Sequence, residues 1–172
     1  MVVIGIDSGY NLGISIVSLE KPKLLYYKYI KVAESKTPIE DFCKKTMQHI
    51  IDTEVEIDYY ACGAKCLIEL PVFHGDKKGE ISLKKGDLFY TYASAITLFN
   101  VLSQHREVEL ITPNRWKGHL KKAQTEKRVK LILGNQVDEI EKLPNYKKEH
   151  IFDSIGMCLS YDKKLWELRS LK

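Results

Sequence analysis

Residues 2–13 have the sequence VVIGIDSGYNLG, and this stretch decides the expected fold. Residues 2–6 form a short apolar run rich in β-branched side chains, which is typical of a strand buried on both faces. Asp7 follows this run, and Ser8-Gly9-Tyr10-Asn11 then supplies residues that favour a turn. The stretch therefore predicts a buried strand that ends in a carboxylate.

The pattern beyond this stretch predicts an antiparallel meander followed by alternating helices and strands. Thr37-Pro38-Ile39-Glu40 has the sequence of a capping box and predicts a helix that starts there and runs to about Ile51. The other expected elements are strands at residues 13–19, 23–32, 66–70 and 108–111, and helices at residues 87–106, 125–133 and 146–161. We therefore expect one domain over residues 1–172, of α/β class, with a five-stranded mixed sheet flanked by helices on both faces.

Composition excludes several classes of protein. The 172 residues are 44% hydrophobic and carry a net charge of +4, which argues against disorder, and no run of about 18 apolar residues could span a membrane. The N-terminal residues lack the basic region of a secretory signal. The four cysteines have no zinc-ligand spacing, so we expect buried thiols in a reducing compartment: Cys43, Cys62, Cys66 and Cys158.

Three carboxylates occupy positions where packing alone does not call for an acid. Asp7 ends the first strand, Glu69 lies inside the apolar run Leu67-Ile68-Glu69-Leu70, and Asp153 lies on the last helix among apolar neighbours. Individually these could be a turn former, an edge-exposed acid and part of a solvated face. Because a buried carboxylate costs several kcal/mol unless it is paired or bound to metal, their joint occurrence favours a site.

The last helix adds a histidine to this set. At about 100° per residue, Glu149, His150 and Asp153 share the side opposite Ile151 and Ile155. Oxygen-rich sites of this kind bind Mg²⁺ or Mn²⁺, and two such ions about 4 Å apart can clamp the attacking and leaving oxygens of a phosphoryl transfer. His150 could ligate a metal or relay a proton. The sequence leaves Glu149 open as the fourth residue, although the position favours His150.

These residues lie in three motifs that resemble those of the RuvC-type Holliday junction resolvases, which belong to the RNase H-like nuclease superfamily. The matching stretches are residues 4–13 (IGIDSGYNLG), 67–69 (LIE) and 150–156 (HIFDSIG). The resemblance implies an RNase H-like fold and Mg²⁺-dependent (or Mn²⁺-dependent) cleavage of four-way DNA junctions by a homodimer that makes paired nicks. It assigns catalysis and metal binding to Asp7, Glu69, His150 and Asp153.

The sequence departs from the family pattern at two of these positions. Ser8 replaces a frequent proline, and His150 stands where many members carry aspartate, which leaves three carboxylates in the expected site. The segment Thr112-Pro113-Asn114-Arg115-Trp116-Lys117 looks more like the phage-type members. The resemblance thus implies the cytoplasm of a prokaryote or a phage-infected cell.

The positive charge is concentrated in one segment. Residues 112–130 carry a net charge of +6, so the rest of the chain sums to −2. With Trp116 and His119 among the cations, the segment suits a surface that follows DNA phosphates, although a solvated loop is the alternative. The family places a charge-neutralising lysine on this segment. The expected DNA contacts here are Arg115, Lys117, Lys121, Lys122 and Lys127.

The loop at residues 71–86 is a second expected contact region. In the resembled family an aromatic at about the place of Phe73 enters the junction centre, although packing of Phe73 under its own loop is an equal alternative. The loop lysines expected to meet phosphates are Lys77, Lys78, Lys84 and Lys85. The helix at residues 87–106 carries more aromatic surface than one core-facing stripe needs, which is consistent with dimerisation.

Three other functions compete with junction resolution. One is another RNase H-like nuclease that cuts branched DNA or an RNA–DNA hybrid, and the second is a non-catalytic nucleic-acid-binding module. The third is the ATP-binding fold of sugar kinases and actin, which shares an Asp-x-Gly turn but needs two such domains. The complete set of carboxylates argues against the non-catalytic module.

Overall fold

The computed structural model describes residues 1–34, 37–72 and 86–168, and its centre is a five-stranded sheet. The strand order is β3-β2-β1-β4-β5, in which β1 is antiparallel to β2 and parallel to β4. The expected mixed sheet and opening meander are confirmed. The strands are β1 (Val2–Asp7), β2 (Asn11–Ser18), β3 (Lys23–Lys31), β4 (Lys65–Glu69) and β5 (Val108–Ile111).

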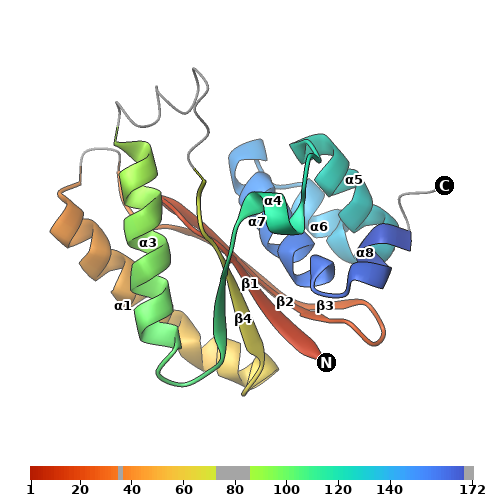
Figure 1. Cartoon of the computed structure of the whole chain (residues 1–172), viewed down its shortest axis with the longest axis horizontal. Coiled ribbons are helices and arrows are strands. Elements are labelled where there is room, and N and C mark those ends of the chain that lie inside the picture. The colour runs from red at the N-terminus through yellow and green to blue at the C-terminus, as the bar shows by residue number, and fades with distance from the viewer. Residues whose placement is uncertain (35–36, 73–85, 169–172) are drawn as a thin grey trace.

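Helices cover both faces of this sheet (Figure 1). On one face lie α1 (Ile39–Ala61) and α3 (Asp87–Leu102). The other face carries α4 (Pro113–Trp116), α5 (Lys122–Leu133), the 3₁₀ turn η1 (Gly134–Val137), α6 (Asp138–Glu141), α7 (Asn145–Ser160) and α8 (Lys163–Leu168). No helix in the described ranges has the length and apolar character needed to cross a membrane.

Alternation along the strands builds two hydrophobic cores. Val3 and Leu67 point toward α7 and its neighbours, whereas Ile4, Ile6 and Ile68 point toward α1 and α3. Because successive side chains of a strand point to opposite faces, strands buried on both sides need apolar residues at consecutive positions. The continuous apolar runs in the sequence are therefore explained by helices on both faces.

Helix α7 lies unusually close to the sheet because two strand residues lack a side chain. A Cβ atom added to Gly5 would lie 2.2 Å from the carbonyl oxygen of Ser154, and one added to Gly13 would lie 2.1 Å from that of His150. The buried hydroxyls of Ser15 and Ser154 share a 2.5 Å hydrogen bond between the same strand layer and the helix. This close approach fixes α7 over β1 and β2.

The first two helices have different bounds from those expected. Helix α1 begins at Ile39, after Pro38 in the N-cap position with no side-chain cap, so the capping box predicted at Thr37 is wrong. The helix also continues ten residues past Ile51, because Thr53, Ile57 and Ala61 extend its buried stripe. Helix α3 ends at Leu102 rather than Arg106.

One burial prediction is also wrong, and the alternative of a solvated face on the last helix is excluded. Cys62 is exposed and Cys43 is half-buried, so only Cys66 and Cys158 are the buried thiols expected of all four cysteines. Helix α7 has no solvated face over residues 151–159, because α5 and α8 pack against it on the side away from the sheet.

Candidate active site

Asp7 and Glu69 lie side by side because their strands are parallel neighbours. The register pairs Ile6 with Ile68, so the next residue on each strand is the carboxylate. Ile6 and Ile68 point toward α1 and α3, so the acids that follow them point to the α7 face, as Leu67 does two residues before Glu69. The hydroxyl of Ser8 donates a 2.8 Å hydrogen bond to the carbonyl oxygen of Glu69 and ties the two strand ends together.

Helix α7 brings the other two predicted residues to this edge of the sheet. His150 Nδ1 lies 2.6 Å from Asp7 Oδ2, and Asp153 is buried one turn further along the helix. Because a carboxylate only accepts, Nδ1 carries the proton in this contact and Nε2 is left facing away from Asp7. The close approach of the helix at Gly13, whose strand partner is Asp7, makes the 2.6 Å contact possible.

The segment after β5 supplies two donors to the carboxylates. Trp116 is buried, and its indole Nε1 donates to Glu69 Oε2 at 2.7 Å. The next residue, Lys117, places its ammonium 3.2 Å from Asp153 Oδ2 and over the Trp116 ring. Pro113 starts the short helix α4 directly after the strand and so turns both side chains toward the acids.

The acids in this cluster lack enough positive charge to balance them. Burial, together with the negative charges of Asp7 and Asp153, raises the pKa of Glu69 to about 8, although Lys117 and the Trp116 indole oppose the rise. Burial and the charge of Asp7 also raise the pKa of Asp153. A cation bound among these crowded carboxylates would therefore reduce their mutual repulsion.

The pKa values of the two basic groups are also raised, but for a base a raised pKa favours the charged form. Burial lowers the pKa of His150, but the hydrogen bond and charge of Asp7 outweigh burial and leave that pKa raised. Burial likewise opposes the charge on Lys117, whose pKa is nevertheless raised by Glu69 and Asp153. The acids therefore shift the pKa of both side chains in the direction that favours the charged form.

The donor set fits a divalent cation by its chemistry. Three carboxylates and one imidazole are ligands that Mg²⁺ and Mn²⁺ accept. In the described ranges, however, no three acidic, histidine or cysteine side chains are gathered in a metal-binding arrangement. The oxygens are instead directed to His150, Trp116 and Lys117, so a bound ion would have to displace some of these contacts.

Glu149, the alternative fourth residue, is directed away from the acidic cluster. Its carboxylate forms a 2.6 Å ion pair with Lys122, on the exposed side of the cluster. The structure therefore places His150, and not Glu149, beside Asp7.

The expected DNA-contacting residues divide into three groups. Lys121 and Lys127 are exposed, whereas Arg115 and Lys122 are exposed but paired with Glu109 and Glu149. Lys117 lies in the acidic cluster itself. Outside the described residues lie Phe73, Lys77, Lys78, Lys84 and Lys85.

Trp116 does not belong to the DNA-facing surface on which the sequence placed it. It is 3% exposed and packs against Trp166 and Gly156, where a Cβ atom would lie 2.8 Å from the Trp116 ring. Its contact with Glu69 was missed because the cations around it dominate the local pattern. The two residues are 47 positions apart and only the tertiary fold brings them together, so no local sequence signal indicates the contact.

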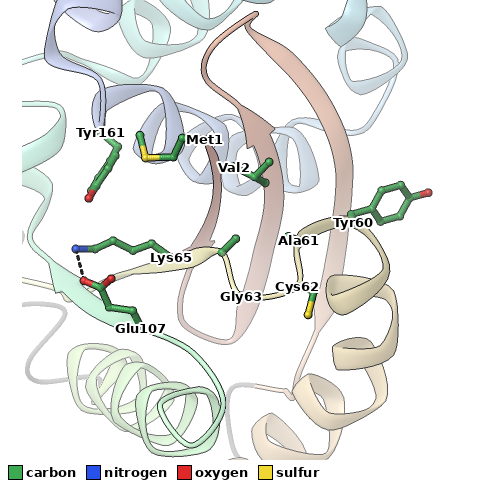
Figure 2. A pocket seen from close by; sticks show the side chains of 10 residues that line it. Met1, Val2, Tyr60, Ala61, Cys62, Gly63, Lys65, Glu107 and Tyr161 are labelled. Carbon is green, nitrogen blue, oxygen red and sulfur yellow. Dashed lines mark hydrogen bonds and ion pairs between the residues drawn. The ribbon is translucent and has the colours of Figure 1, made fainter.

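A hollow of about 460 Å³ lies at the opposite end of β1 and β4 and takes no part in this cluster (Figure 2). Val2 and Lys65, which begin the two strands, line it together with Tyr161 and Glu107. Figure 2 shows Lys65 directed at Glu107 across the opening.

Comparison with solved structures identifies the fold. RuvC from Thermus thermophilus aligns with a TM-score of 0.61 and 22% identity over 99% of this chain and 96% of that chain. The T. thermophilus RuvC complex with a Holliday junction substrate gives 0.60 and 19% over the same shares. The chain has the fold of the RuvC-type Holliday junction resolvases.

The yeast mitochondrial Holliday junction resolvase Ydc2 also aligns with this chain. Its TM-score is 0.62 at 12% identity, over 98% of this chain and 81% of that chain. No protein-family model matches the sequence, and a comparison with curated proteins finds no match. The expected RNase H-like α/β fold is thereby confirmed.

Proposed function

We propose that the chain is a divalent-metal-dependent endonuclease that resolves four-way DNA junctions by paired nicks. The observation that carries this proposal is the under-neutralised set of Asp7, Glu69 and Asp153, held by three different elements at one edge of a RuvC fold. The solved structures that share this fold include RuvC bound to a Holliday junction substrate and the resolvase Ydc2.

The three carboxylates share one role in the proposed reaction, which is to bind metal ions. Asp7, Glu69 and Asp153 would hold Mg²⁺ or Mn²⁺, with His150 as a fourth ligand or proton relay. The ions supply the positive charge and the acidified water that phosphodiester hydrolysis requires. Lys117 sits against Asp153 and would also meet the negative charge of the cleaved phosphate.

His150 is oriented to handle a proton. Its Nδ1–H is held by Asp7, which fixes the ring and leaves Nε2 available on the other side. A carboxylate-oriented imidazole is the arrangement that keeps a general base in one tautomer during proton transfer. In the proposed reaction this nitrogen takes a proton from the attacking water or binds a metal ion.

The substrate would lie across the basic segment beside the acids. Lys121 and Lys127 are exposed on or next to α5 and suit phosphate contacts.

Two opposed nicks need two acidic clusters, so we propose a homodimer. The aromatic surface expected on α3 is partly present, since Phe89 and Tyr92 are exposed whereas Tyr90 and Phe99 pack against the core.

The test is cleavage of a labelled four-way junction by the wild type and an Asp7→Asn variant, with Mg²⁺, Mn²⁺ or EDTA. We expect symmetric paired nicks with either metal, none with EDTA, and a loss of at least a thousandfold in the variant. Equal cutting by the variant would overturn the catalytic assignment.

A parallel panel distinguishes the competing functions. Fork, duplex and RNA–DNA hybrid substrates are cut in the same buffer, and the junction is expected to be cut fastest. Preferential cutting of the hybrid would favour another RNase H-like nuclease. Tight binding without cutting of any substrate would favour a non-catalytic module.

A further inference from the structure

A second hollow, of about 410 Å³, lies next to the acidic cluster and combines aromatic rings with cations. Its lining residues come from three elements: Asn11 from β2, Tyr29 and Lys31 from β3, and Tyr146 and Lys147 from α7. No carboxylate lines it in the described part of the chain. Its chemistry therefore differs from that of the acidic cluster beside it.

The two rings of this hollow are held in place, and that of Tyr146 remains accessible. Tyr29 donates its hydroxyl to Asn11 Oδ1 at 2.6 Å, and its ring meets that of Tyr146 edge to face at 6.0 Å. Tyr146 is nevertheless 57% exposed, which is high for a side chain of its size. The Asn11 amide Nδ2 forms no hydrogen bond within the described residues and can donate to a ligand.

Lys147 adds a positive charge over these rings. Its ammonium lies 5.5 Å from the Tyr29 ring centre and 5.9 Å from that of Tyr146. Within the described ranges it forms no ion pair, in contrast to its neighbour Lys148, which pairs with Glu126. An ammonium without an ion-pair partner in the described ranges, next to the exposed ring of Tyr146, suits a ligand that has both a flat ring system and a negative charge.

The position of the hollow relates it to the acidic cluster. Tyr146 precedes His150 by one helical turn, which is a rise of about 6 Å along α7 and comparable to two base steps of DNA. The ring centres of Tyr29 and His150 are 6.2 Å apart. A DNA strand whose phosphate lies at the acids would thus pass this hollow within one or two nucleotides.

We propose that the Tyr29–Tyr146 hollow binds a nucleotide next to the cleaved phosphate, with its base stacked on Tyr146 and its phosphate against Lys147. This inference rests on the proposed nuclease function and names a second contact for the same strand. Base–aromatic stacking contributes about 1–3 kcal/mol per base and tolerates any base. The Asn11 amide adds a donor that can reach a base edge.

The first experiment measures binding of a four-way junction that carries 2-aminopurine beside the cleaved phosphate, in EDTA so that no cutting occurs. Tyr146→Ala should weaken binding about tenfold and remove the quenching of 2-aminopurine, whereas Tyr146→Phe should stay within about twofold of the wild type. The matched control is Tyr59→Ala, which removes an 83% exposed tyrosine from α1 on the other face of the sheet. Equal binding by Tyr146→Ala and Tyr59→Ala would overturn the proposal.

The second experiment tests the phosphate contact. Lys147→Gln should reduce the slope of log affinity against log salt by about one, whereas Lys142→Gln, which removes an exposed lysine paired with Glu139, should leave the slope unchanged. Equal slopes for the two variants would contradict the placement of a phosphate at Lys147.

The two proposals can fail separately. If the wild type cuts the junction but Tyr146 has no effect on binding, the nucleotide site is overturned and the nuclease function stands. If the wild type cuts nothing but binding still depends on Tyr146 and Lys147, the nuclease function is overturned and the nucleotide site is supported.

Discussion

The charged residues at the two ends of strand β4 differ in how far acids and bases balance one another. At its start, Lys65 lies 2.8 Å from Glu107 and 2.9 Å from Glu109, which also pairs with Arg115, so two cations face two acids. At its last residue, Glu69 shares one lysine with two other acids.

The pKa values follow this difference. Hydrogen bonds to Glu107 and Glu109 raise the pKa of Lys65, and the bond from Lys65 lowers that of Glu109, so each partner stabilises the charge of the other. Burial and mutual repulsion instead raise the pKa of Glu69 to about 8. Balanced charge is typical of structure, whereas acids held together without balance indicate a site for a cation.

Substituting the lysine at each end of β4 should distinguish a structural role, expected for Lys65, from a catalytic role, expected for Lys117. Lys117→Met should lower the rate of junction cleavage by about 10²–10³-fold, because a preorganised positive group next to the reacting phosphate is lost. Lys65→Met should leave the rate unchanged and cost at most about 1 kcal/mol of stability, since its ion pairs are near the surface. Single-turnover cleavage and urea unfolding measure the two effects.

Similar losses of cleavage rate in Lys117→Met and Lys65→Met would refute this difference between the two ends of β4. A melting curve for each protein serves as the control, because a loss of rate counts only when the variant is folded at the assay temperature.

Much of the fold was predictable because its signals are local. The apolar runs at residues 2–6 and 66–70 predicted buried strands, and the turn residues between strands predicted the meander. Helix ends were less predictable. The residues after Ile51 are polar on average, and only the packing of Ile57 and Ala61 against the sheet keeps them helical.

The candidate site was predictable in its acids but not in the groups that contact them. A carboxylate inside an apolar run is a strong signal in a single sequence, and Asp7, Glu69 and Asp153 were found in this way. The indole of Trp116 was not, because its partner is 47 residues away and the tertiary fold alone brings them together. The same holds for Gly13, whose missing side chain matters only because α7 lies on it.

A substitution at Gly13, on β2, should displace part of the acidic cluster without changing the charge of its residues. In Gly13→Ala the added methyl would meet the backbone of His150 at 2.1 Å, so α7 must shift away from the sheet. We expect a loss of about 2 kcal/mol in the free energy of unfolding, as for other overpacked cores, and a displaced His150 ring. Urea unfolding and the NMR signals of the imidazole report these changes.

The matched control for this change is Gly63→Ala. Gly63 has a φ of 70° but no atom within 4 Å of an added Cβ, so its cost comes from the backbone alone. It should lower stability by about 1 kcal/mol and leave the His150 signals in place. Identical imidazole shifts in both variants would mean that contact with α7 is not what positions His150.

The prediction with the smallest expected effect concerns stabilisation by Mg²⁺, and it tests directly whether the acids lack positive charge. If the acids repel one another, Mg²⁺ should stabilise the metal-free protein by about 1.4 kcal/mol when present at about ten times its dissociation constant. Glu69→Gln should abolish this gain, because the variant loses a ligand and part of the repulsion together. Glu107→Gln, which removes a carboxylate from the balanced end, should keep the gain. Because unfolding is measured without DNA, the result does not depend on cleavage, and equal stabilisation of Glu69→Gln and the wild type would place the cation elsewhere.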